Sequence, residues 1–331
     1  IIEQGKDRAI LISSTGTGKT LASAFAMREL GFKRVLFMVH RNQIAIQTRK
    51  SYQKVFDNTV SMGLVGAGYH EYDKDFVFAN VFTLNRDAHL FKFEKDAFDC
   101  IILDEAHHST ANVYQKVIDY FEPKLFLGMT ATPDKRDDSI EGRNVYELFD
   151  HNIAHEIRLQ QAMEDDLLCP FHYFGISDLS IVSEDELSRK KLSDEDFRNL
   201  TSDERVKLIT EEAKYYGFSG ERVKGLIFCS RIDESIELSK KFNEIGYRTI
   251  ALNGDSSEDE RAEAFERLAM GEKDATDDLT PLDYIFSVDI LNEGVDIVEV
   301  NQVIMLRPTQ SPIVFIQQLG RGLRKARDKE Y

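Results

Sequence analysis

The stretch SSTGTGKT at residues 13–20 combines the residue types and the spacing that bind phosphate. Gly16 and Gly18 allow a tight turn whose backbone N–H groups point inward, at the positive end of a following helix. Lys19 would reach the outer phosphates of a nucleotide, and the Thr20 hydroxyl would bind Mg²⁺. We therefore predict a nucleoside triphosphate site at this loop.

A strand and a helix must position this loop. The apolar run RAILIS at 8–13 predicts a buried strand, and KTLASAFAMREL at 19–30 predicts an amphipathic helix. Three apolar side chains are expected on or near one face of that helix: Leu21, Phe25 and Leu30. Ser13 stands where the pattern G-x-x-x-x-G-K-[ST] has its first glycine. The strand–loop–helix context is the one that the pattern requires, and it favours a nucleotide site over a chance turn.

Two adjacent carboxylates follow another predicted strand. The run ILDEAHH ends that strand, so Asp104 and Glu105 would lie at its carboxyl end and face the phosphate loop. Asp104 would hold Mg²⁺, usually through water, and Glu105 would orient and deprotonate an attacking water. The next predicted strand ends in GMTATP, where Thr130 and Thr132 place hydroxyls beside the carboxylates. Together these residues indicate hydrolysis of the bound nucleotide.

Two arginines lie near the far end of the chain, in QQLGRGLR. Arg321 and Arg324 are three positions apart, so on a helix they would share a face. Guanidinium groups can stabilise the charge that develops on a transferred phosphoryl group. If a second domain supplied them to the nucleotide, domain closure would be the catalytic event. Taken in isolation, they are more simply surface charges.

Apolar runs of strand length occur in two series. The first series comprises 34–40, 76–83, 99–106 and 124–132, and the second comprises 167–176, 223–230, 248–254, 283–290 and 302–308. Near-continuous Val, Ile, Leu and Phe content predicts burial on both faces, as in a parallel sheet. Helical patterns at 233–246 and 259–271 separate strands of the second series. We predict two α/β domains, 1–158 and 159–331, each a mainly parallel sheet flanked by helices.

Composition sets the remaining limits. The 331 residues are 42% hydrophobic and 30% charged, which is typical of a soluble globular protein. The net charge of −16 argues against a general polyphosphate-binding surface, so any contact with nucleic acid must be local. Three widely spaced cysteines favour a reducing compartment, and no apolar run approaches a membrane span, so we expect a cytoplasmic location. The chain begins with Ile1, and we expect it to be a fragment of a longer protein.

Eight stretches of the chain, in order, resemble motifs I to VI of the superfamily 2 helicases and translocases. They are SSTGTGKT, FMVHRNQIAIQ, NVFTLN, DEAH, GMTATPDKRDD, GLIFCSR, NEGVDIVEVNQVIMLRPTQS and FIQQLGRGLR, spread over residues 8–325. The branch that they resemble most contains the translocation subunits of type III restriction enzymes. The resemblance implies two RecA-like P-loop domains that hydrolyse ATP with Mg²⁺ and move on DNA, with duplex DNA favoured over single-stranded DNA. It also implies a bacterial protein with further domains, a nuclease among the candidates. An RNA helicase and a nucleotide-gated clamp or switch remain as alternatives.

The same resemblance assigns roles to individual residues. The residues implied to cradle the phosphates are Gly16, Thr17, Gly18, Lys19 and Thr20. His107, Thr130 and Thr132 are implied to couple hydrolysis to domain movement. Gly294 and Asp296 would contact the nucleotide and the strand, while Gln317, Arg321 and Arg324 would complete the site from the second domain. The element that reads adenine would lie upstream of the phosphate loop, where few residues remain, so the preference for ATP rests on the family alone.

Loops at the strand ends are implied to contact DNA. Their residues are His40, Arg41, Thr83, Ser230 and Arg231. Backbone N–H groups and hydroxyls that contact phosphates position a strand without reading its sequence, and this mode also suits an acidic protein. For His40 and Arg41, the polar start of a helix is the simpler alternative.

Overall fold

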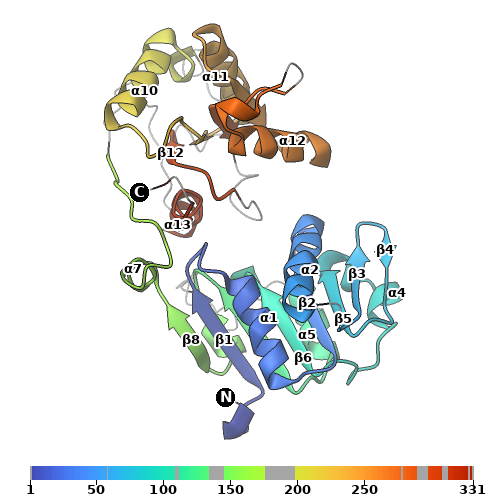
Figure 1. Cartoon of the computed structure of the whole chain (residues 1–331). Coiled ribbons are helices and arrows are strands. Elements are labelled where there is room, and N and C mark those ends of the chain that lie inside the picture. The colour runs from blue at the N-terminus through green and yellow to red at the C-terminus, as the bar shows by residue number, and fades with distance from the viewer. Residues whose placement is uncertain are drawn as a thin grey trace. The chain divides into compact units, whose positions relative to one another are not determined.

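Our computed structural model describes residues 2–57, 59–108, 112–133, 145–175, 198–276, 279–288, 297–307, 312–326 and 329. The chain divides into two compact units, Ile1–Asp165 and Asp166–Tyr331, which we call the first and the second unit (Figure 1). The sequence pattern predicts a boundary between 158 and 159, and the compact units divide between 165 and 166. Each unit has a mainly parallel sheet with helices packed on it, so the predicted α/β class is confirmed.

The first unit is built on a sheet that contains eight strands among the described residues, in the order β4-β3-β5-β2-β6-β7-β1-β8. The strands are β1 Arg8–Ser13, β2 Val35–Val39, β3 Met62–Gly66, β4 Tyr69–His70, β5 Phe76–Asn80, β6 Cys100–Asp104, β7 Leu125–Thr130 and β8 Ile153–Ile157. Only the β3–β4 pair is antiparallel among these neighbours. The carboxyl ends of β1, β7, β6, β2 and β5 therefore lie side by side at one edge of the sheet.

Helices cover both faces of this sheet (Figure 1). The helices of the first unit are α1 Lys19–Leu30, α2 Asn42–Phe56, α3 Val81–Leu84, α4 Asp87–Leu90, α5 Asn112–Tyr120, α6 Val145–Leu148 and α7 Leu159–Glu164, of which α7 lies beyond the end of β8, with short 3-10 turns at Ile2–Gln4 and Ala106–His108. Alternate strand residues enter opposite cores, because successive side chains of a strand point to opposite faces. Phe37 and Phe78 pack with α1 and α2, whereas Leu36 and Val77 pack with α3, α4 and α5. The near-continuous apolar runs of the sequence follow from this double burial.

The predicted bounds of α1 are confirmed, but its predicted apolar face does not enter the core. The exposed fractions of Leu21, Phe25 and Leu30 are 42%, 45% and 48%. The buried side chains of α1 are instead Ser23, Ala24 and Met27. Small side chains let α1 approach the sheet and α2 closely, and the Ser23 hydroxyl bonds the Tyr52 hydroxyl of α2 at 2.7 Å. Close helix packing therefore selects the small-residue face over the larger apolar one.

The second unit contains a parallel sheet of four strands among the described residues, in the order β10-β11-β9-β12. The strands are β9 Gly225–Phe228, β10 Thr249–Leu252, β11 Tyr284–Ser287 and β12 Gln302–Met305. The helices are α10 Asp203–Tyr216, α11 Ile232–Glu244, α12 Glu258–Ala269 and α13 Pro312–Leu319, with a 3-10 turn at Glu272–Asp274. The predicted strands at 223–230, 248–254, 283–290 and 302–308 are confirmed by β9, β10, β11 and β12.

The strand predicted at 167–176 is wrong over its described part, because residues 167–175 lie outside any helix or strand. Pro170 cannot donate a ladder hydrogen bond, and the aromatic side chains that follow pack on helices. Phe174 stacks on Tyr216 of α10 with ring centroids 3.9 Å apart, and Tyr173 meets Phe315 of α13 at 5.7 Å. The apolar character of this run therefore serves helix contacts and adds no strand here.

Candidate functional site

The phosphate loop follows β1 and leads directly into α1. Gly16 has φ 89° and Gly18 has φ 84°, values in the left-handed region that favours glycine. The Lys19 ammonium donates to the carbonyl oxygens of Ser13 at 2.9 Å and Ser14 at 3.3 Å. The Thr17 hydroxyl donates to the Ser14 carbonyl at 2.7 Å and lies 2.5 Å from the Ser13 hydroxyl. Ser13 therefore fits the position of the first glycine, because its side chain bonds within the loop.

The two carboxylates lie at the end of β6, at the same edge of the sheet: Asp104 is its last residue, and Glu105 follows it. The Glu105 N–H donates to Asp104 Oδ1 at 3.1 Å, and Glu105 has φ 48°, an uncommon value for a side-chain-bearing residue. Burial and then the neighbouring Glu105 carboxylate raise the pKa of Asp104 to about 7, opposed by the charges of Lys19 and His40. The site thus carries negative charge that a cation would stabilise. The oxygen ligands of Asp104 and Thr20 suit Mg²⁺, so the residues fit the nucleotide–metal pair that the motif implies.

His107 connects these carboxylates to the end of β7. Its Nδ1 lies 2.9 Å from Thr130 Oγ1 and 3.3 Å from Glu105 Oε2. Thr130 Oγ1 also accepts the N–H of Thr132 at 3.1 Å. His107, Thr130 and Thr132 are all buried, so the three residues form a fixed contact behind Glu105. The structure thus brings the predicted coupling residues together with the predicted general base.

The predicted nucleic-acid loops of the first unit are joined by Asn80, which the sequence analysis missed. The Asn80 amide donates to the His40 carbonyl at 3.3 Å, and its Oδ1 accepts the N–H groups of Phe82 at 2.9 Å and Thr83 at 3.3 Å. Arg41 follows His40 as the N-cap residue of α2. Because the Thr83 N–H is occupied, the hydroxyl of Thr83 is the group left to contact a phosphate. An asparagine between an apolar strand and a short helix is a typical N-cap signal.

The corresponding loop of the second unit follows β9 and begins α11. The Ser230 N–H donates to Glu234 Oε2 at 2.8 Å, and Arg231 forms a two-point ion pair with Asp233 at 2.9 and 2.8 Å. Glu234 is also paired with Arg205 at 2.9 Å, and both side chains are at most 1% exposed. This buried ion pair anchors the Ser230 loop to α10. Sequence reasoning missed it because its partners lie on two different helices.

Arg321 and Arg324 do not share a helix face, so that prediction is wrong. Helix α13 ends at Leu319, and both arginines lie in the segment after it. Gly320 and Gly322 flank Arg321, and glycines favour the end of a helix. Gln317 lies within α13, and both it and Arg321 are 5% exposed. Gly294 and Asp296, the remaining predicted contacts, lie outside the described residues.

Lys329 fixes the segment that carries these arginines. Its ammonium donates to the carbonyl oxygens of Val300, Gly322 and Arg324, the last at 2.9 Å. Burial lowers the pKa of Lys329 to about 8. The Cys169 N–H donates to the Leu323 carbonyl of the same segment at 2.8 Å. The arginine segment is therefore held by the side chain of Lys329, shortly after it in the sequence, and by the backbone of Cys169, far from it in the sequence.

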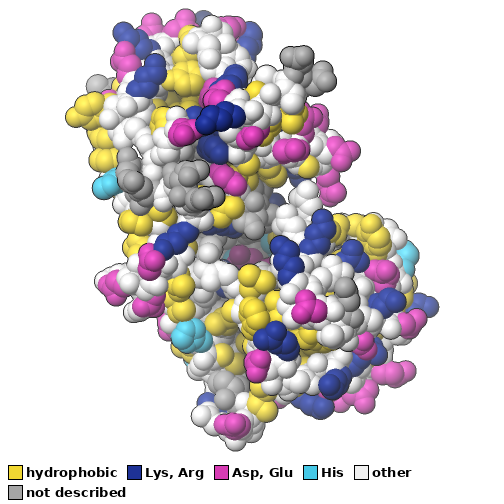
Figure 2. Space-filling view, in the orientation of Figure 1, with side chains coloured by type: hydrophobic (Ala, Val, Ile, Leu, Met, Phe, Trp, Pro, Cys, Tyr) yellow, Lys and Arg dark blue, Asp and Glu magenta, His cyan; other side chains and the backbone are white. Residues whose placement is uncertain are grey.

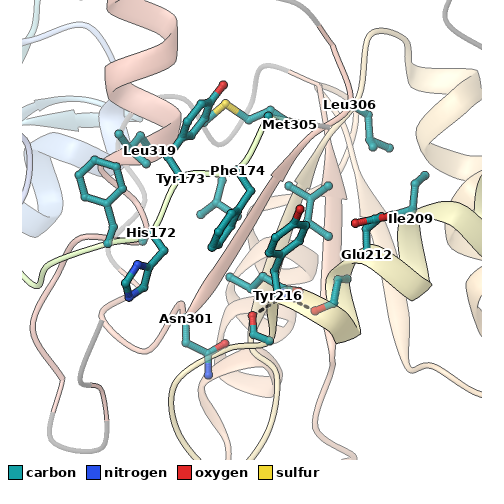
Figure 3. Close-up of a pocket in the computed structure, with 18 of the residues that line it drawn as sticks. His172, Tyr173, Phe174, Ile209, Glu212, Tyr216, Asn301, Met305, Leu306 and Leu319 are labelled. Atoms are coloured by element: carbon teal, nitrogen blue, oxygen red, sulfur yellow. Dashed lines mark hydrogen bonds between the residues drawn. The ribbon is translucent and has the colours of Figure 1, made fainter. Parts of the chain in front are cut away.

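A cavity of about 560 Å³ lies in the second unit, against β12 and beside Gly322 and Leu323 of the arginine segment (Figure 3). Figure 3 shows the side chains of Tyr173, Phe174, Tyr216 and Met305 around it. None of the predicted site residues that the structure describes is among its lining residues. The cavity therefore adjoins the arginine segment but is lined by neither arginine.

Two further observations concern the helices and the cysteines. Over the described ranges, no helix is both long enough and apolar enough to cross a bilayer. Cys100, Cys169 and Cys229 are all buried free thiols.

Comparison with known proteins gives two family matches. The family of the type III restriction enzyme res subunit matches residues 1–135, and the helicase conserved C-terminal domain matches residues 205–326. A relative named "Putative ATP-dependent helicase IRC3" from Saccharomyces cerevisiae is 25% identical over 100% of this chain and 48% of its own length. The chain spans about half the length of the curated relatives that it matches.

Solved structures of similar fold cover nearly the whole chain. A fragment described as "a putative HsdR subunit of a type I restriction enzyme" from Vibrio vulnificus YJ016 has a TM-score of 0.69 and 22% identity, over 99% of this chain and 59% of that one. The ATP-dependent Type ISP restriction-modification enzyme LlaBIII bound to DNA has a TM-score of 0.67 and 20% identity, over 100% of this chain and 26% of that one. The two units thus have the RecA-like fold that the motifs predict.

Proposed function

We propose that this chain, which belongs to the superfamily 2 helicases and translocases, is the ATP-hydrolysing motor of a protein that steps along DNA or separates its strands. The observation that carries the proposal is the common edge of the first sheet. The phosphate loop, the carboxylates, Thr130, His40 and Thr83 all follow neighbouring parallel strands that end there. Nucleotide chemistry and nucleic-acid contacts would therefore share one edge of one rigid sheet.

The residues of the first unit divide the work of hydrolysis. Backbone N–H groups from Gly16 to Thr20 would bind the phosphates, with Lys19 turning its ammonium from the Ser13 carbonyl to the outermost phosphate. Thr20 and Asp104 would hold Mg²⁺, which supplies charge neutralisation when it is bound. Glu105 would orient the attacking water and accept its proton. Burial and the Glu105 carboxylate raise the pKa of Asp104, so a bound cation would favour its charged form.

Coupling between the two activities would run through contacts already formed. His107 contacts both Glu105 and Thr130, so a movement of the Glu105 carboxylate would be transmitted through the His107 ring to Thr130 at the end of β7. The family resemblance assigns Gln317, Arg321 and Arg324 to the same reaction from the second unit, and Gly294 and Asp296 to nucleotide and strand contacts. We retain these roles as part of the proposal.

DNA is favoured over RNA as the polymer. The match to the type III restriction enzyme res subunit supports this choice. A shared fold does not fix the substrate, so an RNA helicase remains the second candidate. Because the chain spans about half of its relatives, we propose that it works with further domains of a longer bacterial cytoplasmic protein, a nuclease among the candidates.

The test is the rate of ATP hydrolysis with duplex DNA, single-stranded DNA and RNA at several salt concentrations, using the longest polypeptide that contains this chain. Duplex DNA should raise the rate, RNA should raise it less, and salt should weaken the effect because phosphate contacts release counterions. Equal rates with and without nucleic acid would favour a clamp or switch. Stimulation by RNA alone would favour the RNA helicase.

A further inference from the structure

Phe82 lies among the predicted nucleic-acid contacts and faces solvent. It sits between Val81 and Thr83 in the first turn of α3, directly after β5. Val81 and Leu84 are fully buried, whereas 54% of Phe82 is exposed. The short helix is thus anchored by its apolar neighbours, and the aromatic ring is the part that remains outside.

The backbone of Phe82 is fixed by the same contact that joins the two loops. Its N–H donates to Asn80 Oδ1 at 2.9 Å, while the Asn80 amide bonds the His40 carbonyl. Asn80 itself is 7% exposed. The ring therefore projects from a rigid support next to His40 and Thr83, the positions assigned to phosphate contacts.

A second exposed aromatic, Tyr69, belongs to the same surface. It pairs with Gly66 across the β3–β4 hairpin, whose two-residue turn has positive φ at both positions. A Cβ atom at Gly66 would lie 3.0 Å from Asn80 Cβ and 3.5 Å from Thr83 Oγ1. Directly opposed residues of an antiparallel pair project to the same face of the sheet, so Tyr69, which is 46% exposed, stands on the face of Asn80 and Thr83.

The absence of a side chain at Gly66 keeps this surface open. Gly66 has φ 131°, and an added Cβ would meet Asn42 Oδ1 at 2.7 Å. Figure 2 shows hydrophobic side chains gathered over the end of the sheet where β3 and β4 lie, and Lys and Arg side chains over α2 beside them. Aromatic rings interleaved with cations are the composition of sites that hold single-stranded nucleic acid.

We propose that Phe82 stacks on an unpaired base of the strand whose phosphates contact the neighbouring loops, and that Tyr69 provides a second stacking surface. A phenyl ring has no hydrogen-bonding group for a phosphate or a sugar, but its face matches the face of any base. A base inside a duplex offers only its edges in the grooves. The inference rests on the proposed function and adds to it that the engaged strand is unpaired at this point, as strand separation requires.

The test compares two strands of equal length and charge. One is a fluorescein-labelled 20-nucleotide oligothymidylate, and the other has the same backbone with tetrahydrofuran residues in place of every nucleoside. Full-chain Phe82→Ala should bind the oligothymidylate about tenfold more weakly, because stacking of one base on an aromatic side chain supplies an effect of that order. Its affinity for the abasic strand should stay within about twofold of wild type, because the phosphate contacts remain. Tyr69→Ala should show the same selectivity, and Phe82→Tyr should retain wild-type binding.

Phe91→Ala is the matched control. Phe91 is 61% exposed and follows α4, where its ring lies 5.4 Å from Tyr120. It should change neither affinity. Equal losses on both strands in Phe82→Ala would overturn stacking and indicate a supporting role for the loop, and an unchanged affinity for both strands would overturn it outright. If the wild-type protein bound neither strand at low salt, the proposed function would be overturned as well. This result is distinguishable from a failure of the stacking proposal alone, in which the wild-type protein still binds both strands.

Discussion

Removing one partner of the buried Arg205–Glu234 ion pair should destabilise the second unit strongly. The two side chains are 1% and 0% exposed, and Arg205 Nη1 lies 2.9 Å from Glu234 Oε1. Arg205 also donates to the Leu200 carbonyl at 2.6 Å, and Glu234 accepts the Ser230 N–H at 2.8 Å. Glu234→Gln preserves the shape of the side chain but leaves the guanidinium charge buried without its counter-charge.

Loss of one member of a buried pair typically costs about 3–5 kcal/mol, because the remaining charge is neither paired nor hydrated. With a denaturant slope of about 1–3 kcal/mol per molar urea, the unfolding midpoint of the second unit should fall by roughly 1–5 M. The double variant Arg205→Met/Glu234→Leu replaces the pair with apolar side chains. It should recover most of the lost stability, to within about 2 kcal/mol of wild type.

The assay is urea unfolding followed by far-ultraviolet circular dichroism, since the chain has no tryptophan. Hydrogen exchange at β9 amides should assign the transition to the second unit, because two units need not unfold together. Glu211→Gln is the control: Glu211 forms an exposed pair with Lys207 at 3.7 Å, and its loss should cost less than about 1 kcal/mol. A Glu234→Gln cost as small as that of Glu211→Gln would refute the reasoning.

Three further predictions concern the first unit. Glu105→Gln should bind ATP normally but turn over at least about a hundredfold more slowly, because it lacks the base; wild-type turnover would assign the base to another residue. Lys19→Ala should weaken ATP binding itself, which titration of a fluorescent ATP analogue measures; unchanged affinity would contradict the role of the loop. Although burial raises the pKa of Asp99, hydrogen bonds from the Lys124 ammonium and from the backbone N–H groups of Arg34 and Lys33 outweigh it and lower that pKa. The stability from Asp99 is thus present above the unfolded pKa near 3.9 and is lost as pH falls through the lower folded value. Asp99→Asn should cost about 2 kcal/mol in urea unfolding at pH 7, and this cost should shrink steadily as the pH is lowered below the unfolded pKa; a cost that did not change with pH over this range would exclude this linkage.

The sequence predicted best those features that neighbouring residues determine by themselves. The phosphate loop lies between β1 Arg8–Ser13 and α1 Lys19–Leu30, the bounds that the pattern indicates, because glycine conformation and strand burial are local properties. Near-continuous apolar runs likewise predicted the buried parallel strands. The prediction of two RecA-like domains is confirmed by the fold, and the roles of the individual site residues remain predictions.

The features that the sequence analysis missed or predicted wrongly depend on packing between segments that lie far apart in the sequence. Leu21 and Phe25 are apolar but exposed, because α1 packs through Ser23 and Ala24, and residue type alone cannot reveal which face packs more closely. Strand β8, Ile153–Ile157, has neither a continuous apolar run nor an alternating pattern and is largely exposed, so only its pairing with β1 identifies it. The Arg205–Glu234 pair and the Asn80 contact likewise join residues whose proximity the fold alone creates.

Movement on DNA is the central claim, and displacement of a triplex-forming oligonucleotide measures it most directly. The substrate is a linear duplex that carries the third strand far from its ends, mixed with ATP, Mg²⁺ and the longest polypeptide that contains this chain. We expect ATP-dependent release of the third strand, abolished by Glu105→Gln, which retains ATP binding but not turnover. ATP hydrolysis that DNA stimulates, without release of the third strand from this duplex or of a strand from a forked one, would contradict a motor and leave a clamp.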